Sequence, residues 1–127
     1  MSLSTINRSS SKTFTKTSSE TKNRVLTRLR AADKRLFFLL AETFQALGDS
    51  SRVQIVWSLA QGELCVGEIA ELLEMSQPAI SHHLRTLRNL KLVRVRKDGR
   101  TSYYALDDEH IERLLREGIK HVEDLLE

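Results

Sequence analysis

Hydrophobic residues recur at helical spacing over most of the chain. The first such stretch begins near Arg24 and continues to Gly48, a residue type that commonly ends a helix. The next starts at Asp49 or Ser50, either of which can cap it, and stops before Gly62. Both predict scaffold helices. The second stretch is expected to place in the core the side chains of Val53, Ile55, Val56, Trp57 and Leu59.

Two shorter helices are predicted next, joined by a tight turn. They span residues 66–73 and 77–89, and Ser76 caps the second, which has Pro78 in its first turn. The buried stripe of the second helix is Ile80, Leu84 and Leu87, and its outward face carries Gln77, Ser81, His82, Arg85 and Arg88. This arrangement is typical of a helix-turn-helix.

A pattern of alternating apolar and polar residues follows and predicts a β-hairpin. Residues 92–97 alternate, residues 98–99 are the strong turn signal Asp-Gly, and residues 101–106 return. Lys97 and Arg100 lie at the tip of this wing, where they can reach a phosphate or the minor groove. The predicted fold class is therefore α+β, mostly α. It is a winged helix-turn-helix with a two-stranded wing, dimerising through terminal helices.

The last predicted helix, residues 108–126, combines a large apolar surface with four side chains that can bind metals. The apolar surface needs a partner, for which a second copy of the chain is suitable. The candidate ligands are Asp108, His110, His121 and Asp124. Eleven residues separate the two histidines, which is about 16 Å along a helix, so one helix cannot bring both to one ion.

The two histidines nevertheless point the same way, because eleven steps of about 100° leave a difference of only about 20°. If two copies pair antiparallel, the start of one helix meets the end of the other. This predicts two symmetric interchain sites per homodimer, each with Asp108 and His110 of one chain and His121 and Asp124 of the other. In the competing interpretation, Asp108 is an ordinary helix cap and the late His121 only suits the helix dipole.

Charge along the chain adds a second kind of partner. The formal charge of +3 is divided as +7 in residues 1–36, −5 in 37–75, +6 in 76–104 and −5 in 105–127. Two basic blocks suit a polyanion such as DNA, because each neutralised phosphate releases counterions. Residues 1–23 are rich in Ser and Thr and predict a disordered basic tail, which leaves residues 24–127 as the folded domain.

The number of cysteines and the hydropathy of the chain limit which disulfides, membrane segments and signal peptides it can contain. Cys65 is the only cysteine, which excludes an intrachain disulfide, and we expect it to be a small buried residue at a helix start. No stretch approaches about 18 consecutive apolar residues, and the first twenty residues lack the apolar centre of a signal peptide. The sequence predicts a cytoplasmic protein with neither a membrane partner nor an organic cofactor.

Three segments resemble the ArsR/SmtB family of bacterial metal-responsive repressors. They are Glu-Leu-Cys-Val-Gly-Glu-Ile at 63–69, Ser-His-His-Leu-Arg-Thr-Leu-Arg-Asn-Leu at 81–90 and Arg-Lys-Asp-Gly-Arg-Thr-Ser-Tyr-Tyr at 96–104. The resemblance covers roughly residues 35–127 and is greatest to the zinc sensors, which implies zinc at the four candidate ligands. Asp124 stands where that family has Glu or His. Gly67 replaces the second cysteine of the Cys-Val-Cys motif of cadmium, lead and arsenic sensors, so their thiolate site is expected to be absent.

Within the predicted helix-turn-helix and wing, the side-chain types suggest different roles. Amide and hydroxyl groups suit base edges, which favours Gln77 and Ser81, whereas Arg85, Lys97 and Arg100 suit phosphates. His82 is predicted to contact DNA, and His83 to lie on the helix surface or pack. The complete predicted DNA-binding set is Ser76, Gln77, Ser81, His82, Arg85, Lys97 and Arg100.

These expectations combine into a zinc-responsive repressor that binds an inverted-repeat operator as a homodimer and is released when zinc binds at the dimer interface. One alternative keeps the DNA-binding fold but makes zinc structural and DNA binding constitutive. A zinc hydrolase is disfavoured, because four protein ligands leave no open coordination position. The protein is therefore not expected to be an enzyme.

Overall fold

A computed structural model describes residues 18–127, and the predicted tail up to residue 17 lies outside the described residues. The chain divides into two compact units, residues 1–36 and 37–127. In the first unit, helix α1 (Ser18–Ala31) has no buried residue and carries Glu20 in its first turn, where a carboxylate favours a helix start. Residues 18–23, predicted as part of the tail, are therefore helical.

The apolar period before Gly48 is divided between α1 and a second helix, α2 (Leu36–Leu47). At the break, a carboxylate oxygen of Asp33 accepts the backbone N–H of Arg35 at 2.8 Å. Local bonds of this kind compete with helical hydrogen bonding, which explains why the helix does not continue. The pattern of apolar residues could not reveal the break, because their spacing is helical in α1 and again in α2.

The next three helices lie where the sequence predicts them: α3 (Ser50–Leu59), α4 (Val66–Leu73) and α5 (Gln77–Asn89). Asp49 caps α3 by accepting the backbone N–H of Arg52 at 3.0 Å. Ser76 caps α5, because its hydroxyl oxygen accepts the backbone N–H of Ala79 at 3.2 Å. The Ser76 cap therefore fixes where the second helix of the helix-turn-helix begins, as expected from its short polar side chain.

The sheet has three antiparallel strands in the order β1-β3-β2: β1 (Leu64–Cys65), β2 (Val93–Asp98) and β3 (Thr101–Leu106). The predicted hairpin is confirmed as β2–β3, and Gly99 takes a φ of 65° at its turn. The wing has the two strands expected, and the sheet gains a third, short strand, β1, in which Leu64 pairs with Tyr104. Two residues are too few to show the alternation that identifies a strand in a sequence.

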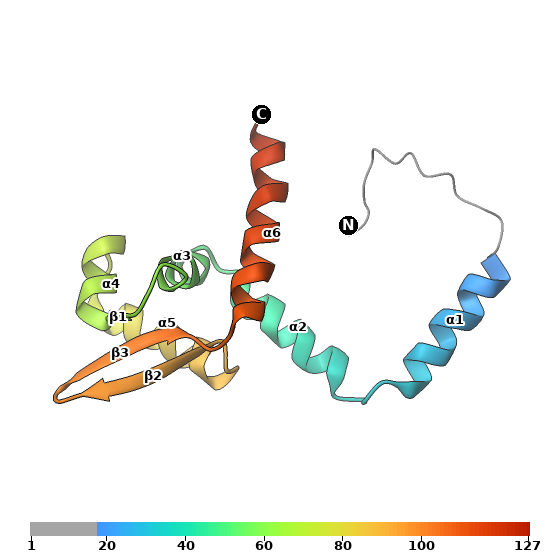
Figure 1. The fold of residues 1–127 in the computed structure, drawn as a ribbon, viewed down its shortest axis with the longest axis horizontal. Coiled ribbons are helices and arrows are strands. Elements are labelled where there is room, and N and C mark those ends of the chain that lie inside the picture. The colour runs from blue at the N-terminus through green and yellow to red at the C-terminus, as the bar shows by residue number, and fades with distance from the viewer. Residues whose placement is uncertain (1–17) are drawn as a thin grey trace. The chain divides into compact units, whose positions relative to one another are not determined.

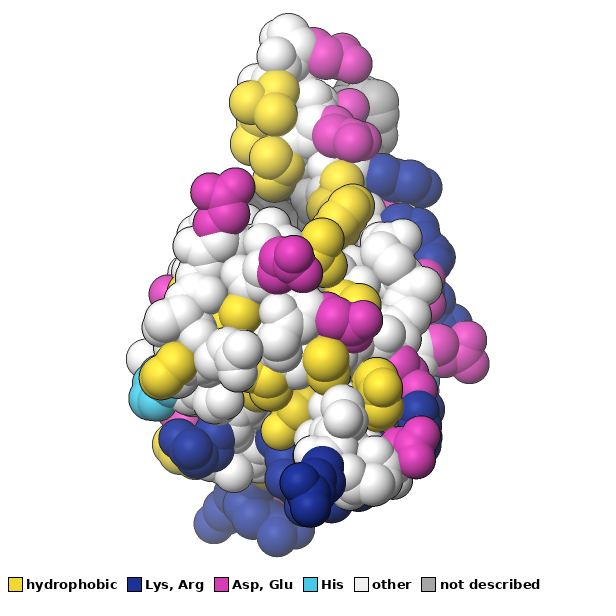
Figure 2. All heavy atoms as spheres, turned by 90° about the vertical axis from the view of Figure 1, so that its left-hand side faces the viewer, with side chains coloured by type: hydrophobic (Ala, Val, Ile, Leu, Met, Phe, Trp, Pro, Cys, Tyr) yellow, Lys and Arg dark blue, Asp and Glu magenta, His cyan; other side chains and the backbone are white. Residues whose placement is uncertain are grey.

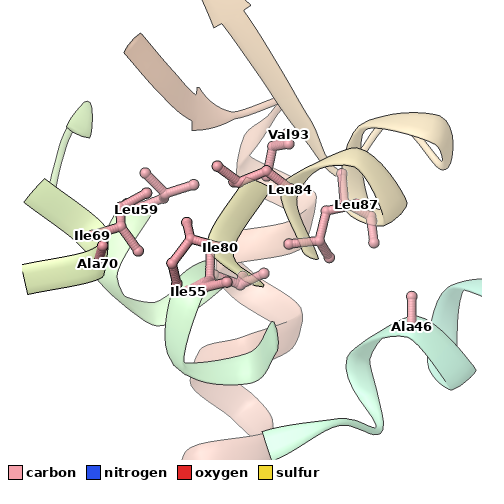
Figure 3. Packing of buried hydrophobic residues seen from close by; sticks show 11 residues of the cluster. Ala46, Ile55, Leu59, Ile69, Ala70, Ile80, Leu84, Leu87 and Val93 are labelled. Atoms are coloured by element: carbon pink, nitrogen blue, oxygen red, sulfur yellow. The ribbon is translucent and has the colours of Figure 1, made fainter. Parts of the chain in front are cut away.

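The buried core joins α3, α4 and α5 to the strands (Figure 3). Its fully buried large side chains are Ile55, Val56, Ile69, Ile80, Leu84, Leu87 and Val93. Trp57, predicted to be in the core, has 51% of its surface exposed, so that prediction is wrong. Cys65, expected to be buried, is half-buried at the start of α4.

The last helix, α6 (Glu109–Leu126), follows Asp108 and packs one side on this core through Ile111 and Leu115. From residue 120 onward every side chain is exposed, and Figure 1 shows this half of α6 standing clear of the sheet. Helix α2 also exposes large apolar side chains, namely Leu36, Phe37, Phe38, Leu39, Leu40 and Phe44. Both α2 and α6 therefore present apolar surface that the single chain leaves uncovered.

Candidate DNA-binding interface and metal site

Helix α5 presents its polar side to solvent while three leucine and isoleucine side chains anchor its other side. Ser76, Gln77, His82 and Arg85 are exposed, and Ser81 is half-buried. Among residues 18–127, Arg85 takes part in no ion pair, so its charge is available to a ligand. The predicted contact residues of this helix thus lie on one accessible side.

The wing adds two further cations at its tip. Lys97 and Arg100 flank the Asp98-Gly99 turn, and both are exposed. Figure 2 shows Lys and Arg side chains gathered at the lower end of the face that contains the wing. Together with Arg85 they give the helix-turn-helix and wing a positive surface, which suits a phosphate backbone.

Arg96 braces the wing instead of contributing to its free positive charge. Its guanidinium donates to both carboxylate oxygens of Glu63, at 2.8 and 3.2 Å, and lies 5.0 Å from the centre of the Tyr103 ring. The hydrogen bonds from Arg96 hold the pKa of the Glu63 carboxyl below its usual value. The sequence did not reveal this pair, because 33 residues separate its members.

His83 makes a contact inside the fold, although it belongs to α5. It is half-buried, and its Nδ1 lies 3.4 Å from a terminal nitrogen of Arg52 in α3. The Nε of Arg52 also donates to the backbone oxygen of Ala46, at the end of α2, at 2.7 Å. The packing alternative predicted for His83 is therefore confirmed. Arg52 joins α3 to α5 through this contact, and no pattern in the sequence marks it for that role.

Asp108 occupies the helix-cap position, as the competing interpretation of the candidate ligands expects. Its Oδ1 accepts the backbone N–H groups of His110 and Ile111, at 2.9 and 3.4 Å, and lies 3.4 Å from Nδ1 of His110. Desolvation acts to raise the pKa of Asp108, but the hydrogen bonds from His110 and Ile111 outweigh it and lower the pKa. Within the described residues, Oδ2 of Asp108 accepts none of the hydrogen bonds, so capping leaves one oxygen for another partner.

The other two candidate ligands, His121 and Asp124, are exposed near the end of α6. Over the described part of a single chain, no three His, Cys, Asp or Glu side chains come close enough to hold a metal ion. The structure thus brings Asp108 together with His110, but it leaves the second pair at the far end of the same helix. Imidazole and carboxylate groups are the donors that zinc accepts, so the residue types fit this ion.

The start of α6 is tied to the wing. One guanidinium nitrogen of Arg94, in β2, donates to the backbone oxygens of Leu106 and Asp107, both at 3.1 Å. These two residues lead directly into Asp108. The first candidate metal-ligand pair and the hairpin therefore share a short, hydrogen-bonded connection.

No helix among residues 18–127 has the length and hydropathy needed to span a bilayer.

Known proteins are similar to this chain in both sequence and fold. Residues 49–95 match the family model of the bacterial regulatory proteins of the arsR family. The cadmium resistance transcriptional regulatory protein CadC homolog of Staphylococcus aureus is 45% identical over 83 residues, which cover 65% of this chain and 69% of the relative. The transcriptional repressor SmtB homolog of a Synechocystis species is 44% identical over 85 residues, covering 67% and 64%. The chain thus spans about two thirds of the length of these relatives.

A solved structure extends the similarity to the fold. It is the homodimeric winged helix-turn-helix DNA-binding domain of Mb0332 from Mycobacterium bovis, a possible ArsR-family transcriptional regulator. The two structures agree with a TM-score of 0.70 at 32% sequence identity, over 76% of this chain and 91% of that one. The predicted winged helix-turn-helix is thereby confirmed. The chain belongs to the arsR family of bacterial regulatory proteins, a family of transcriptional regulators and not of enzymes.

Proposed function

We propose that this protein is a homodimeric transcriptional repressor that binds an inverted-repeat operator and releases it when zinc binds between its α6 helices. One observation carries the proposal. His110 and His121 are both exposed, whereas Ile111 and Leu115 on another side of α6 hold the helix to the core. The two histidines therefore lie on a side of α6 that the rest of the chain leaves exposed.

The uncovered apolar surface supports the homodimer. Leu114, Val122 and Leu125 of α6 are 39%, 50% and 69% exposed, and α2 adds six exposed large apolar side chains. Large exposed apolar side chains gathered on a helix in this way are typical of an interface between proteins. The Mb0332 domain, which shares this fold, is a homodimer. A two-fold pairing of α6 helices would cover the surface with an identical one.

The proposed DNA roles follow from the chemistry of each side chain. Gln77 and Ser81 suit base edges in the major groove, where amide and hydroxyl groups match the donor and acceptor pattern. Arg85, Lys97 and Arg100 suit phosphates, which position the protein without selecting a sequence. Ser76 and His82 complete the contact surface. In a two-fold dimer the two copies of α5 would face two half-sites, which is why the operator is expected to be an inverted repeat.

Zinc fits the candidate site by its ligand types. Each site would use Asp108 and His110 of one chain and His121 and Asp124 of the other, a set of two imidazoles and two carboxylates suited to tetrahedral zinc. The S. aureus relative is a cadmium resistance regulator. A set of Asp and His ligands without thiolates favours zinc or cobalt over softer, thiolate-seeking ions in this chain.

Release of DNA follows if zinc favours a dimer whose α5 helices are wrongly spaced for the operator. The Arg94 contacts with Leu106 and Asp107 offer a route, because they join the wing to the residue before Asp108. The coupling must be reciprocal: if zinc weakens DNA binding, DNA weakens zinc binding by the same factor, commonly about 1–3 kcal/mol.

A direct titration tests the proposal against the structural-zinc alternative. A labelled DNA duplex selected by the metal-free protein from a random pool is titrated with protein, by fluorescence anisotropy, with chelator or with stoichiometric zinc. The proposal expects weaker DNA binding with zinc, and no zinc effect for His121→Ala. Glu123→Ala, an exposed neighbour outside the ligand set, is the matched control and should respond like the wild type. Equal or tighter binding with zinc would favour structural zinc.

A further inference from the structure

Helix α6 has an exposed stripe that contains more than the two histidines. With 3.6 residues per turn, five residues fall within an arc of about 80°, and all five are exposed: His110, Leu114, Gly118, His121 and Leu125. Leu114 lies between the histidine positions along the helix, and Gly118 lies one turn after it. The candidate ligands and these two residues therefore face the same partner surface.

The pairing of the ligands fixes which residues of the two helices meet, so the following step rests on the proposed function. In an antiparallel two-fold pair, opposite residues have a constant sum of residue numbers. His110 with the partner's His121 gives 231, and Asp108 with the partner's Asp124 gives 232. The two-fold axis then passes beside residue 116. At the same sum, Leu114 lies opposite the partner's Gly118.

Gly118 has no explanation within the single chain. Its φ lies outside the left-handed region, so the helix does not require glycine there, and a Cβ built on it would meet no heavy atom within 4 Å. Glycine lowers the stability of a helix interior relative to alanine. Glycine at position 118 therefore lowers the stability of α6, and it relieves no crowding inside the single chain.

We propose that Leu114 of each protomer packs directly onto Gly118 of the partner subunit, so that the two α6 helices approach closely beside the two-fold axis. The absence of a side chain at Gly118 leaves room for the leucine, as small residues do wherever helices come close. This contact sets the separation of the helices. That separation in turn decides whether His110 and the partner's His121 can reach one ion, because zinc–nitrogen bonds are only about 2.0–2.1 Å long.

A side-chain exchange tests this contact without zinc. The dimer dissociation constant is measured by sedimentation equilibrium, in chelator, for the wild type, Gly118→Leu, and the double variant Leu114→Gly with Gly118→Leu. Gly118→Leu should raise the constant about tenfold or more, because two leucines then compete for one space. The exchange variant restores one leucine opposite one glycine and keeps the amino-acid composition of the helix. Its constant should return to within about threefold of the wild type.

Two controls keep the result interpretable. Lys120→Leu places the same side chain about 200° around the helix from Gly118 and should leave the dissociation constant near the wild-type value. Circular dichroism confirms that each variant is folded. The contact is wrong if Gly118→Leu leaves the dimer unchanged or strengthens it, or if the exchange variant is no tighter than Gly118→Leu. A successful exchange together with no zinc effect on DNA would uphold the contact and refute the proposed sensor function.

Discussion

Arg52 reaches from α3 to His83 of the recognition helix, with 3.4 Å between a guanidinium nitrogen and the imidazole Nδ1. The same side chain donates to the backbone oxygen of Ala46 at 2.7 Å. It therefore joins three helices at one point: the end of α2, the first turn of α3 and the middle of α5. Since α2 carries exposed apolar surface and α5 carries the proposed DNA contacts, Arg52 lies between the two proposed interfaces.

Arg52→Met should destabilise the fold and reduce DNA affinity. Methionine keeps much of the aliphatic stem but leaves the oxygen of Ala46 without its donor, a loss of about 1–2 kcal/mol in the free energy of unfolding, measured with urea. Arg52→Lys should recover only part of the loss, because one ammonium group cannot reproduce the planar fork that serves two acceptors. Full recovery by lysine would show that charge alone, and not the geometry of the fork, positions α5.

Ser76→Ala should remove the cap of α5 and cost about 0.5–2 kcal/mol of unfolding free energy. Ser76→Asn provides the control, since asparagine caps well and should keep most of this stability. If the alanine variant loses DNA affinity and the asparagine variant does not, the cap matters more than a direct contact of the hydroxyl. Urea unfolding and DNA titration of both variants separate the two roles.

Arg85→Ala and Gln77→Ala should weaken DNA binding in different ways. Loss of the Arg85 phosphate contact should lower affinity almost equally for all sequences and reduce the salt slope of log K by about one. Loss of Gln77 should relax discrimination at one base pair, by about 1–3 kcal/mol, and leave the salt slope unchanged. The measurement is affinity for matched and single-mismatch duplexes over a salt series. A changed salt slope in Gln77→Ala would contradict the base-edge assignment.

Asp124 stands where the zinc sensors that this chain resembles have Glu or His. A substitution at this position therefore tests whether the residue binds zinc. Asp124→Ala should weaken zinc binding by removing an oxygen donor, whereas Asp124→Glu should retain it, because zinc accepts either carboxylate. Zinc affinity is measured by competition with a chromophoric chelator at fixed pH. Glu123→Ala, one residue away and outside the proposed set, serves as the control. Unchanged affinity in Asp124→Ala would remove this residue from the site.

The Glu63–Arg96 pair predicts a pH-dependent wing. Because hydrogen bonds from Arg96 lower the pKa of Glu63, the pair stabilises the folded wing above the ordinary carboxyl pKa and loses that contribution as pH falls through the lower folded pKa. The Arg96 side-chain N–H resonance should therefore shift in acid as the pair breaks. In Glu63→Gln this acid transition should be absent, and its persistence would assign the shift to another carboxyl group.

Sequence patterns located most of α3, α4, α5, the hairpin and α6, because local signals mark their ends. Ser76 caps its own helix, and the turn at Gly99 needs a residue that tolerates positive φ. The missed features depend on contacts between distant segments or on very short ones. Strand β1 is two residues long, and Arg52 meets His83 across 31 residues of sequence. Trp57 has the spacing of a core residue, yet the fold places nothing over half of its surface.

The candidate ligands stay a prediction for a related reason. Helical spacing places His110 and His121 on one stripe, but a second chain is needed to complete any site, and a single fold contains no such neighbour. The exposed side of α5 could be predicted, because the spacing of its apolar residues within one helix determines which side is buried. Features that one chain forms alone could thus be predicted from the sequence, whereas a site shared by two chains could not be tested in a single one.

The two carboxylate oxygens of Asp108 differ in their contacts, and this difference affects how the side chain would bind a metal ion. One oxygen already fastens the first turn of α6 through two backbone N–H groups, and the other takes no part in this. The side chain is therefore held in place before any ion arrives, and capture would not require the helix to fold. A protein built in this way keeps its structure under chelation, in contrast to small zinc domains that unfold when stripped of metal. Metal availability would then alter the relation between two folded chains while the amount of folded protein stays constant.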